Sequence, residues 1–554
     1  MRPIRSFLRR YWAISAALAA GVLAIGAGAG VQASASASSA SSQDSCAVGT
    51  NLQTSAGPVC GIVDNGVSEW LGIPYAAPPV GVLRWQPPQP HAPWTARLHA
   101  TAFGSECTQP ASPNVASPLP LTGSENCLFV NVWRPPGTTS AAGLPVMVHI
   151  HGGGFVVGSG NGDNTLLATT GHEIIVSLNY RLGIFGFLAD SALGPNSGDY
   201  GVQDQQAAMR WVQQNIAAFG GDPRNVTIFG ESAGGSSVCD QIASPTAKGL
   251  FEKAISTSGE YGSILGIPAS LVPIEDQDCK AALPSQAQAD SIGTGFAKAL
   301  GCASASHVAT CLQRAPVTDI AKVAGFGYQY SGQGTIAPTI NGSTLTMSLR
   351  QALKTGRVNR VPVIAGTDRD ENLIAQPTTP SEYRTAVSAQ YGKFASQVLA
   401  RYPLDHFDSP YVAFRTVAAD SDTVCPSIVT DEALALRMPV YGYLITDNDI
   451  PPYAATGTVG TPAGASHVGA WYLNPVNPAL DANQQVLQNQ EIASVTTFAR
   501  TGNPSAKNTP VWPEFNHSGT EMELASAGDS QVMPISQIEA IHNCGFWNQI
   551  TPQP

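Results

Sequence analysis

The sequence of 554 residues contains little charge and no excess of basic residues. Charged residues make up 12% of the chain, about half the share of an ordinary globular protein. With 39 acidic and 28 basic residues the formal charge is −11, and this acidic balance argues against nucleic acid as a partner. After the N-terminal segment, no apolar run reaches the roughly 18 residues of a membrane span. We therefore expect no stable membrane insertion.

The ten cysteines lack the spacing of a metal site. None forms C-x-x-C, and none lies at ligand spacing from a histidine, so we expect no metal. An even number of cysteines instead suits disulfides in an oxidising compartment. Close spacing predicts the local pairs Cys107–Cys127 and Cys302–Cys311, with Cys46–Cys60 as a further candidate. The partners of the remaining four stay open: Cys239, Cys279, Cys425 and Cys544.

The N-terminus has the pattern of a secretory signal peptide. Four arginines precede an apolar stretch over about residues 11–29, and a tract of alanine and serine follows. A basic region, an apolar region and small residues at a cleavage zone define such a signal. Three cleavage points fit equally well, after Ala33, Ala35 or Ala37. We predict removal of about residues 1–37 and export of one domain, 38–554; a retained membrane anchor is the alternative.

From residue 144 onward, apolar strands alternate with helical segments. LPVMVHI, EIIVSL, VTIF and VPVIAGT are apolar runs of strand length, whereas QDQQAAMRWVQQNIAAF has apolar residues at helical spacing. Repeated strand–helix units predict an α/β protein with a mostly parallel sheet and helices on both faces. MPVYGYLITD is predicted to be the final strand, and the helix from Asp481 comes last. Residues 246–355 interrupt the pattern and are predicted to form a helical and loop insertion over one edge of the sheet.

One segment between a predicted strand and a predicted helix carries a candidate nucleophile. The strand Val226–Phe229 runs into Gly230-Glu231-Ser232-Ala233-Gly234, and small residues of helical character follow. Strand, G-x-S-x-G and helix form the context of a nucleophile elbow, in which a sharp turn exposes the serine hydroxyl. The glycines leave room where the chain reverses tightly. A chance match of the pentapeptide is the alternative, and its flanks argue against it.

A serine nucleophile requires an oxyanion hole, a base and an acid. Glycines after the strand VMVHI allow backbone N–H groups to converge on a substrate oxygen. We predict that Gly153, Gly154 and Ala233 donate these N–H groups. The candidate base is His467, in a loop after the last predicted strand. Asp370-Glu371 follows the strand VPVIAGT and supplies the acid, and spacing alone does not choose between the two.

The motifs together resemble the type-B carboxylesterase family. They include GIPYAAPPVGVLRW, SENCLFVNVWRP, HGGGF, FGESAG, GLFEKAISTSG and GTDRDE, in family order. The resemblance implies the α/β-hydrolase fold and a serine hydrolase that needs no metal or cofactor. It also implies a role for each matching residue: Ser232 is the nucleophile, Glu231 an acidic neighbour in the site, Glu371 the triad acid and His467 the base. The pairs Cys107–Cys127 and Cys302–Cys311 match bridges of the family.

The predicted reaction is ester hydrolysis through an acyl-enzyme, with a small-molecule ester as substrate. The nineteen residues between Cys107 and Cys127 contain no aromatic side chain to face a quaternary ammonium group, and no long apolar helix suited to a lipid interface. We therefore favour short- or medium-chain or aryl esters and a secreted carboxylesterase. A lipase or polyester hydrolase is the alternative, followed by a non-catalytic binding protein of the same fold. The oligomeric state is left open.

Overall fold

The computed structural model describes most of the chain after the N-terminal segment. The described residues are 46–111, 120–259, 279, 283–304, 306–324, 336–370, 377–447, 480–515 and 519–550. The predicted signal peptide lies outside them, so the domain boundaries stay a prediction. None of the described helices is long and apolar enough to cross a membrane.

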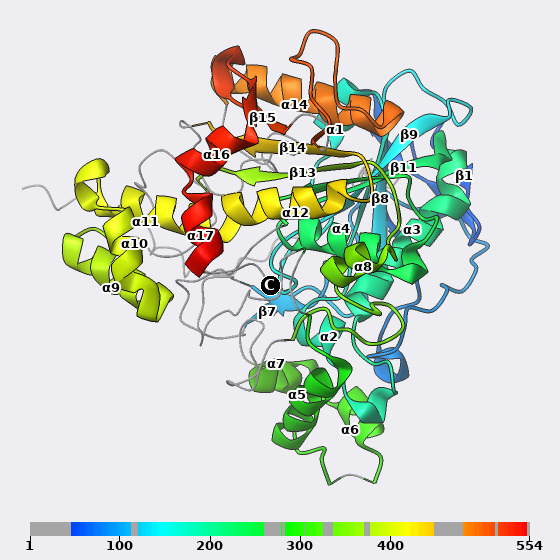
Figure 1. The fold of residues 1–554 in the computed structure, drawn as a ribbon. Coiled ribbons are helices and arrows are strands. Elements are labelled where there is room, and N and C mark those ends of the chain that lie inside the picture. Colours follow the sequence, from blue (N-terminus) through cyan, green and yellow to red (C-terminus); the bar gives the residue numbers. More distant parts are fainter. Residues whose placement is uncertain are drawn as a thin grey trace, which may run out of the picture. The chain divides into compact units, whose positions relative to one another are not determined.

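Eleven strands of the described chain form one sheet in the order β16-β15-β14-β13-β12-β11-β9-β10-β8-β4-β3 (Figure 1). Their bounds are β3 (Ile62–Asp64), β4 (Val67–Pro74), β8 (Phe129–Arg134), β9 (Leu144–Ile150), β10 (Ile174–Leu178), β11 (Gly221–Glu231), β12 (Lys253–Thr257), β13 (Val363–Asp368), β14 (Val440–Ile445), β15 (Thr520–Leu524) and β16 (Gln531–Pro534). The strands from β10 through β15 are parallel, and the outer pairs at both edges are antiparallel. The predicted mostly parallel sheet is confirmed.

Short strands form two smaller sheets near the sequence start. β1 (Leu52–Gln53), β2 (Pro58–Cys60) and β5 (Leu98–His99) make one, and β6 (Gln109–Pro110) and β7 (Leu121–Thr122) make the other. The second pair lies between Cys107 and Cys127, so the disulfide closes a short hairpin.

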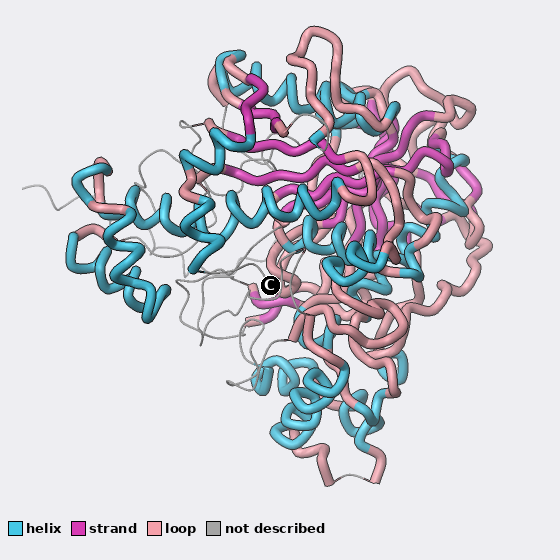
Figure 2. The backbone as a smooth tube through the Cα atoms, viewed as in Figure 1, coloured by secondary structure: helices cyan, strands magenta, loops and turns pink. Residues whose placement is uncertain are grey.

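Helices cover both faces of the large sheet, as Figure 2 shows. Alternate strand residues enter different cores. Val146, Val148 and Ile150 of β9 pack in the core that includes helices α3 (Tyr200–Phe219) and α4 (Ala233–Ala243), whereas Met147 packs in the core that includes α14 (Ala482–Thr501). This alternation follows from the two-residue period of a strand. It explains why the central strands are apolar along their whole length.

The described α-helices follow in chain order. They are α1 (Thr165–Gly171), α2 (Gly183–Phe187), α3 (Tyr200–Phe219), α4 (Ala233–Ala243), α5 (Gln286–Ala299), α6 (Val308–Arg314), α7 (Val317–Ala324), α8 (Leu349–Thr355), α9 (Pro380–Tyr391), α10 (Ala395–Arg401), α11 (Pro410–Ala419), α12 (Cys425–Ala435), α14 (Ala482–Thr501), α16 (Ile535–Ile541) and α17 (Cys544–Ile550). A π-helical turn, η7 (Asp420–Val424), joins α11 to α12.

Two expectations about strands were wrong. The predicted insertion, residues 246–355, contains β12, a central strand between β11 and β13. Its sequence, KAIST, is short and begins with a charge, and the Lys253 ammonium donates to the Asn225 side chain at 2.5 Å. The predicted final strand, β14, is followed by β15 and β16, which extend the sheet past it.

Candidate active site

Ser232 occupies the sharp turn between β11 and α4. Its backbone has φ +57° and ψ −125°, a region that non-glycine residues enter at a cost of about 1–3 kcal/mol. The Ser232 N–H donates to the Thr257 carbonyl at the end of β12 (3.0 Å), and Ser232 O accepts from Ser236 N–H within the first turn of α4 (2.9 Å). The strained conformation is therefore held from both sides, as a nucleophile elbow requires.

Glycines make this turn possible because the backbone of β9 lies directly against it. A Cβ on Gly234 would lie 2.1 Å from the Ile150 carbonyl oxygen, and one on Gly230 would lie 2.5 Å from the carbonyl carbon of Gly234. A Cβ on Gly152 would lie 3.2 Å from the Cβ of Ser232. The loop after β9 and the nucleophile turn are thus in direct contact.

The loop after β9 contains two consecutive glycines with positive φ. Gly153 and Gly154 have φ values of +98° and +62°, which glycine adopts without strain. Within the described residues, no backbone hydrogen bond uses the N–H of Gly153, Gly154 or Ala233 as a donor. Ala233 is the first residue of α4, where an N–H has no partner inside its own helix. Their role as oxyanion donors stays a prediction.

The two histidines of β9 and its loop are structural. The His151 ring stacks on Tyr180 at 4.3 Å, and its Nδ1 donates to the Gly152 carbonyl at 2.8 Å. Burial lowers the pKa of His151 to about 3 and that of His149 to about 4. Both rings are therefore neutral near pH 7, and His151 holds the glycine loop in place.

Asp370 is the last residue of the described segment 336–370 and follows β13. It lies at the carboxyl ends of the parallel strands, as Ser232 does. Its carboxylate pairs with the neighbouring Arg369 and with Arg415 of α11, the latter at 3.2 Å. Asp370 is thus engaged in ion pairs. The other triad predictions, Glu371 and His467, lie outside the described residues.

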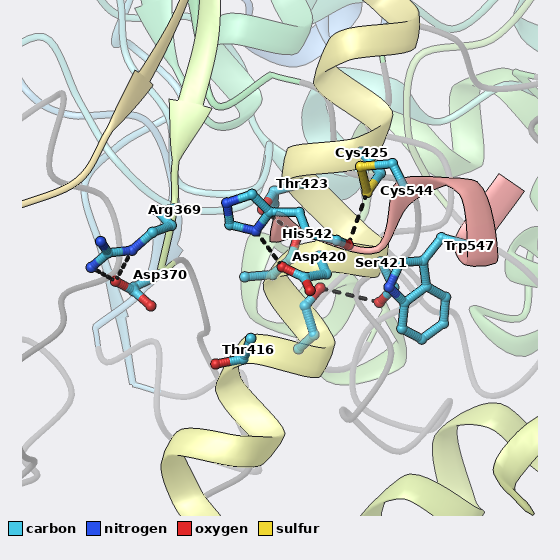
Figure 3. A network of polar contacts seen from close by, with 12 residues as sticks. Arg369, Asp370, Thr416, Asp420, Ser421, Thr423, Cys425, His542, Cys544 and Trp547 are labelled. Atoms are coloured by element: carbon cyan, nitrogen blue, oxygen red, sulfur yellow. Dashed lines mark hydrogen bonds and ion pairs between the residues drawn. A yellow bond between two sulfur atoms is a disulfide. The ribbon is translucent and has the colours of Figure 1, made fainter. Parts of the chain in front are cut away.

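A buried polar network continues from α11 into the π-helical turn (Figure 3). Asp420 of η7 contacts His542 Nδ1 at 2.5 Å and accepts a hydrogen bond from the Tyr402 hydroxyl at 2.8 Å. Trp547 Nε1 in turn donates to that hydroxyl at 2.7 Å. Burial raises the pKa of Asp420, and the His542 contact lowers it.

This network has no counterpart in the sequence predictions. A carboxylate beside a histidine resembles half of a catalytic triad. Within the described residues, however, no serine hydroxyl bonds to the His542 ring, and the contact joins η7 to the connection between α16 and α17. The disulfide Cys425–Cys544 joins the start of α12, which follows η7, to the start of α17. We assign the pair a structural role, which supports the helix that carries Arg415.

All ten cysteines are paired. The structure has Cys107–Cys127, Cys302–Cys311 and Cys46–Cys60, together with Cys239–Cys279 and Cys425–Cys544, whose partners the spacing left open. Among the described residues, one group of possible metal ligands joins Cys46, Cys60 and His99. Both of its sulfur atoms belong to a disulfide, and a metal requires the free thiolate.

The fold and this turn define the class of protein. A parallel sheet with helices on both faces, carrying a serine in a strained G-x-S-x-G turn beside a glycine loop, is an α/β-hydrolase.

Comparisons with known proteins give the family. The model of the carboxylesterase family matches residues 49–547. Para-nitrobenzyl esterase of Bacillus subtilis (strain 168) is 34% identical over 480 residues, 85% of this chain and 93% of the relative. Pyrethroid hydrolase Ces2a of Mus musculus is 30% identical over 521 residues, 88% of each chain. A solved structure of PNB esterase aligns with a TM-score of 0.70 and 30% identity over 90% of this chain and 100% of its own. The chain belongs to the carboxylesterase family and is a carboxylic ester hydrolase.

The contact between Gly234 and β9 predicts the effect of one added methyl group. Gly234→Ala would place Cβ against the Ile150 carbonyl, which the sheet holds in place, so the turn must open. We expect a lower unfolding temperature and a fall in esterase activity of at least about tenfold, because misplacing a reacting group is costly. The matched control is Gly545→Ala, since a Cβ there meets nothing within 4 Å. A Gly234→Ala protein as stable and as active as this control would contradict the described packing.

A buried acid in α4 predicts a pH dependence of stability. Burial raises the pKa of Asp240 from 3.8 to about 8. As pH rises above 3.8 the unfolded chain releases this proton while the folded chain retains it, so the folded state loses stability up to about pH 8. Asp240→Asn removes this dependence, and its unfolding free energy should therefore rise relative to wild type between pH 4 and pH 8. Urea titrations across this range measure the difference.

Asp222 provides a control of opposite sign. The Arg224 backbone N–H lowers the pKa of Asp222, so ionisation of this group favours the folded state. Asp222→Asn should consequently lose stability relative to wild type as pH rises through the titration of Asp222. A pH-independent difference for Asp240→Asn would show that its carboxyl titrates normally in the folded protein.

Proposed function

We propose that this carboxylesterase is secreted and acts through a triad of Ser232, His467 and Glu371. His467 takes the proton of Ser232 as its Oγ attacks the ester carbonyl, and the alcohol leaves with a proton returned by His467. Water then attacks the acyl-enzyme by the same route. Glu371 orients His467 and stabilises its charged form. The strained turn at Ser232 is the observation that carries the proposal, since it presents the hydroxyl at the edge of the sheet.

The N–H groups of Gly153, Gly154 and Ala233 are proposed to bind the oxyanion of each tetrahedral intermediate. Each such donor contributes about 3 kcal/mol to stabilising the transition state. Glu231 adds a negative charge next to the nucleophile. Its side chain lies against the oxyanion loop, since its Oε2 is 2.9 Å from where a Cβ on Gly152 would be.

The proposed substrates are short- or medium-chain or aryl esters. An apolar hollow lined by Leu121, Val156 and Phe185 lies beside the loop after β9. Apolar walls suit the hydrocarbon part of a small ester. The names of two relatives, para-nitrobenzyl esterase and pyrethroid hydrolase, also point to small or aromatic esters.

Export is proposed from the N-terminal signal pattern and the disulfides. Five bridges use every cysteine of the chain, and such bridges persist in oxidising compartments outside the cytosol.

Removal of the nucleophile tests the reaction. Ser232→Ala should lower kcat/KM on p-nitrophenyl acetate and butyrate by at least about 10³-fold, because the acyl-enzyme cannot form. The wild-type rate should fall from the short esters to p-nitrophenyl palmitate. Ser381→Ala, an exposed serine at the start of α9, is the matched control and should retain full activity.

Two results would contradict this proposal. A wild-type protein that is inert on every ester would favour a binding protein built on the same fold. A rate that rises sharply on long-chain ester emulsions would favour a lipase.

The choice between Glu371 and Asp370 has a separate test. Glu371→Gln should lower kcat by about 10³–10⁴-fold with little change in unfolding temperature, because it removes only the group that orients the base. Asp370→Asn removes the counter-charge of Arg415, which is 8% exposed. It should therefore lower the unfolding temperature and retain more activity than Glu371→Gln. The reverse pattern in kcat would assign the triad acid to Asp370.

A further inference from the structure

A large groove lies at the amino ends of the central strands, opposite to the end that carries Ser232. It has a volume of about 840 Å³ and is bounded by the residues around η4 (Pro245–Ala247), the segment that leads into β12, and the segment 357–361 that leads into β13. Ser232 follows the carboxyl end of β11, and β11, β12 and β13 are parallel. The groove therefore lies at the amino ends of the same layer of strands. The proposed mechanism uses none of its residues.

Three cationic side chains line this groove: Lys248, Arg357 and Arg360. All three residues are exposed. Among the described residues, none of them forms an ion pair with an acid. The guanidinium groups of Arg360 and Arg437 both lie within 4 Å of where a Cβ on Gly356 would be, so a fourth cation stands next to the rim.

The sequence around the groove is basic, whereas the whole chain is acidic. Between Asp319 and Asp368 the sequence contains no acidic residue but five basic ones: Lys322, Arg350, Lys354, Arg357 and Arg360. The protein as a whole carries a formal charge of −11. Cations lined up without counter-charges repel one another, and an anion between them removes that repulsion.

The lining of the groove is apolar between these charges. Phe251 and Val361 are buried and contribute to it, together with Pro245 and Val358. The one acid in the lining, Glu252, accepts the Val226 backbone N–H at 2.8 Å. The Glu252 carboxylate is thus hydrogen-bonded to β11.

The walls of the groove are fixed by hydrogen bonds. The Asn359 side chain donates to the carbonyls of Gln241 and Ser244 at the end of α4, at 2.9 and 2.8 Å. The Ser244 hydroxyl donates to the Thr344 carbonyl at 2.6 Å. These bonds tie the chain around α8 to α4, which pack against each other (Figure 1). The cavity is consequently preformed, as binding sites for small molecules usually are.

We propose that this groove is a second binding site, for a small amphiphilic anion that consists of a carboxylate on an apolar body. Arg357, Arg360 and Lys248 would hold the carboxylate, since guanidinium groups match its two oxygens. Phe251 and Val361 would contact the apolar body. Ester hydrolysis releases acids of this chemical class, so the enzyme would bind a product-like anion away from its catalytic edge.

Titration calorimetry with sodium octanoate tests the proposal, with the mature protein carrying Ser232→Ala so that no acyl-enzyme forms. The decisive variant adds Arg357→Glu and Arg360→Glu. Its matched control adds Lys298→Glu and Lys507→Glu, which make the same change of charge at two exposed lysines outside the groove. Circular dichroism confirms that each variant is folded. Octan-1-ol serves as the uncharged ligand of equal chain length.

We expect the Arg357→Glu/Arg360→Glu protein to bind octanoate at least about tenfold more weakly than the control, because two attractive charges become repulsive. Lys248→Glu alone should weaken binding less, and added salt should weaken it in the control protein. Octanol should bind all proteins alike.

Three results would overturn the proposal. These are an absence of octanoate binding, equal octanoate binding by the arginine variant and the control, and octanol binding as tight as that of octanoate. Arg357 also follows the C-terminus of α8, where a cation stabilises the helix dipole. A lower unfolding temperature of the arginine variant with unchanged octanoate binding would leave only that role.

Discussion

The close approach of two backbones at the end of the sheet is the constraint on which the candidate site depends. β9 and β11 are neighbours, and α4 begins where β11 ends, so three chain segments converge around Ser232. Only glycine fits where Gly230 and Gly234 meet the backbone. This contact also holds the loop after β9 against the turn, because Gly152 lies against Ser232. The geometry of the candidate site is therefore set by the pairing of β9 and β11.

The strain at Ser232 is compensated by the interactions around it. Its N–H is bonded to Thr257 at the end of β12, and the following helix is almost fully buried. A conformation that costs about 1–3 kcal/mol persists only when the surrounding structure determines it. The central position of β12 therefore matters to the geometry of this turn, although none of its residues is proposed to touch the substrate.

The two ends of the parallel strands have different electrostatic character. At the carboxyl ends lie the serine, the glycine loop and the acid Asp370, held by Arg415 from a helix that the buried network of Asp420 and His542 supports. At the amino ends of β12 and β13 lies a groove with three cations. In parallel strands these two ends are separated by the length of the strands. One scaffold can thus present two sites of different chemistry.

Local patterns in the sequence predicted several of the elements and the candidate nucleophile. The strand of valine and isoleucine before G-E-S-A-G, the helix over Tyr200–Phe219 and the glycines after β9 all follow from residues close in the chain. The disulfide pairs Cys107–Cys127 and Cys302–Cys311 followed from short spacing for the same reason. The family motifs added the roles of Glu371 and His467, which the described residues do not include.

Only the tertiary structure decided features that depend on residues far apart in sequence. β12 is recognisable as a strand because β11 and β13 flank it, whereas its five residues alone carry a weak signal. The partners of Cys239 and Cys425 lie 40 and 119 residues away, and Arg415 meets Asp370 only when η7, which continues α11, packs beside β13. The cationic groove likewise forms only when the turn after α4 and the segment before β13 come together. Local propensity acts within a few residues, and these contacts are set by how the sheet brings distant segments to one edge.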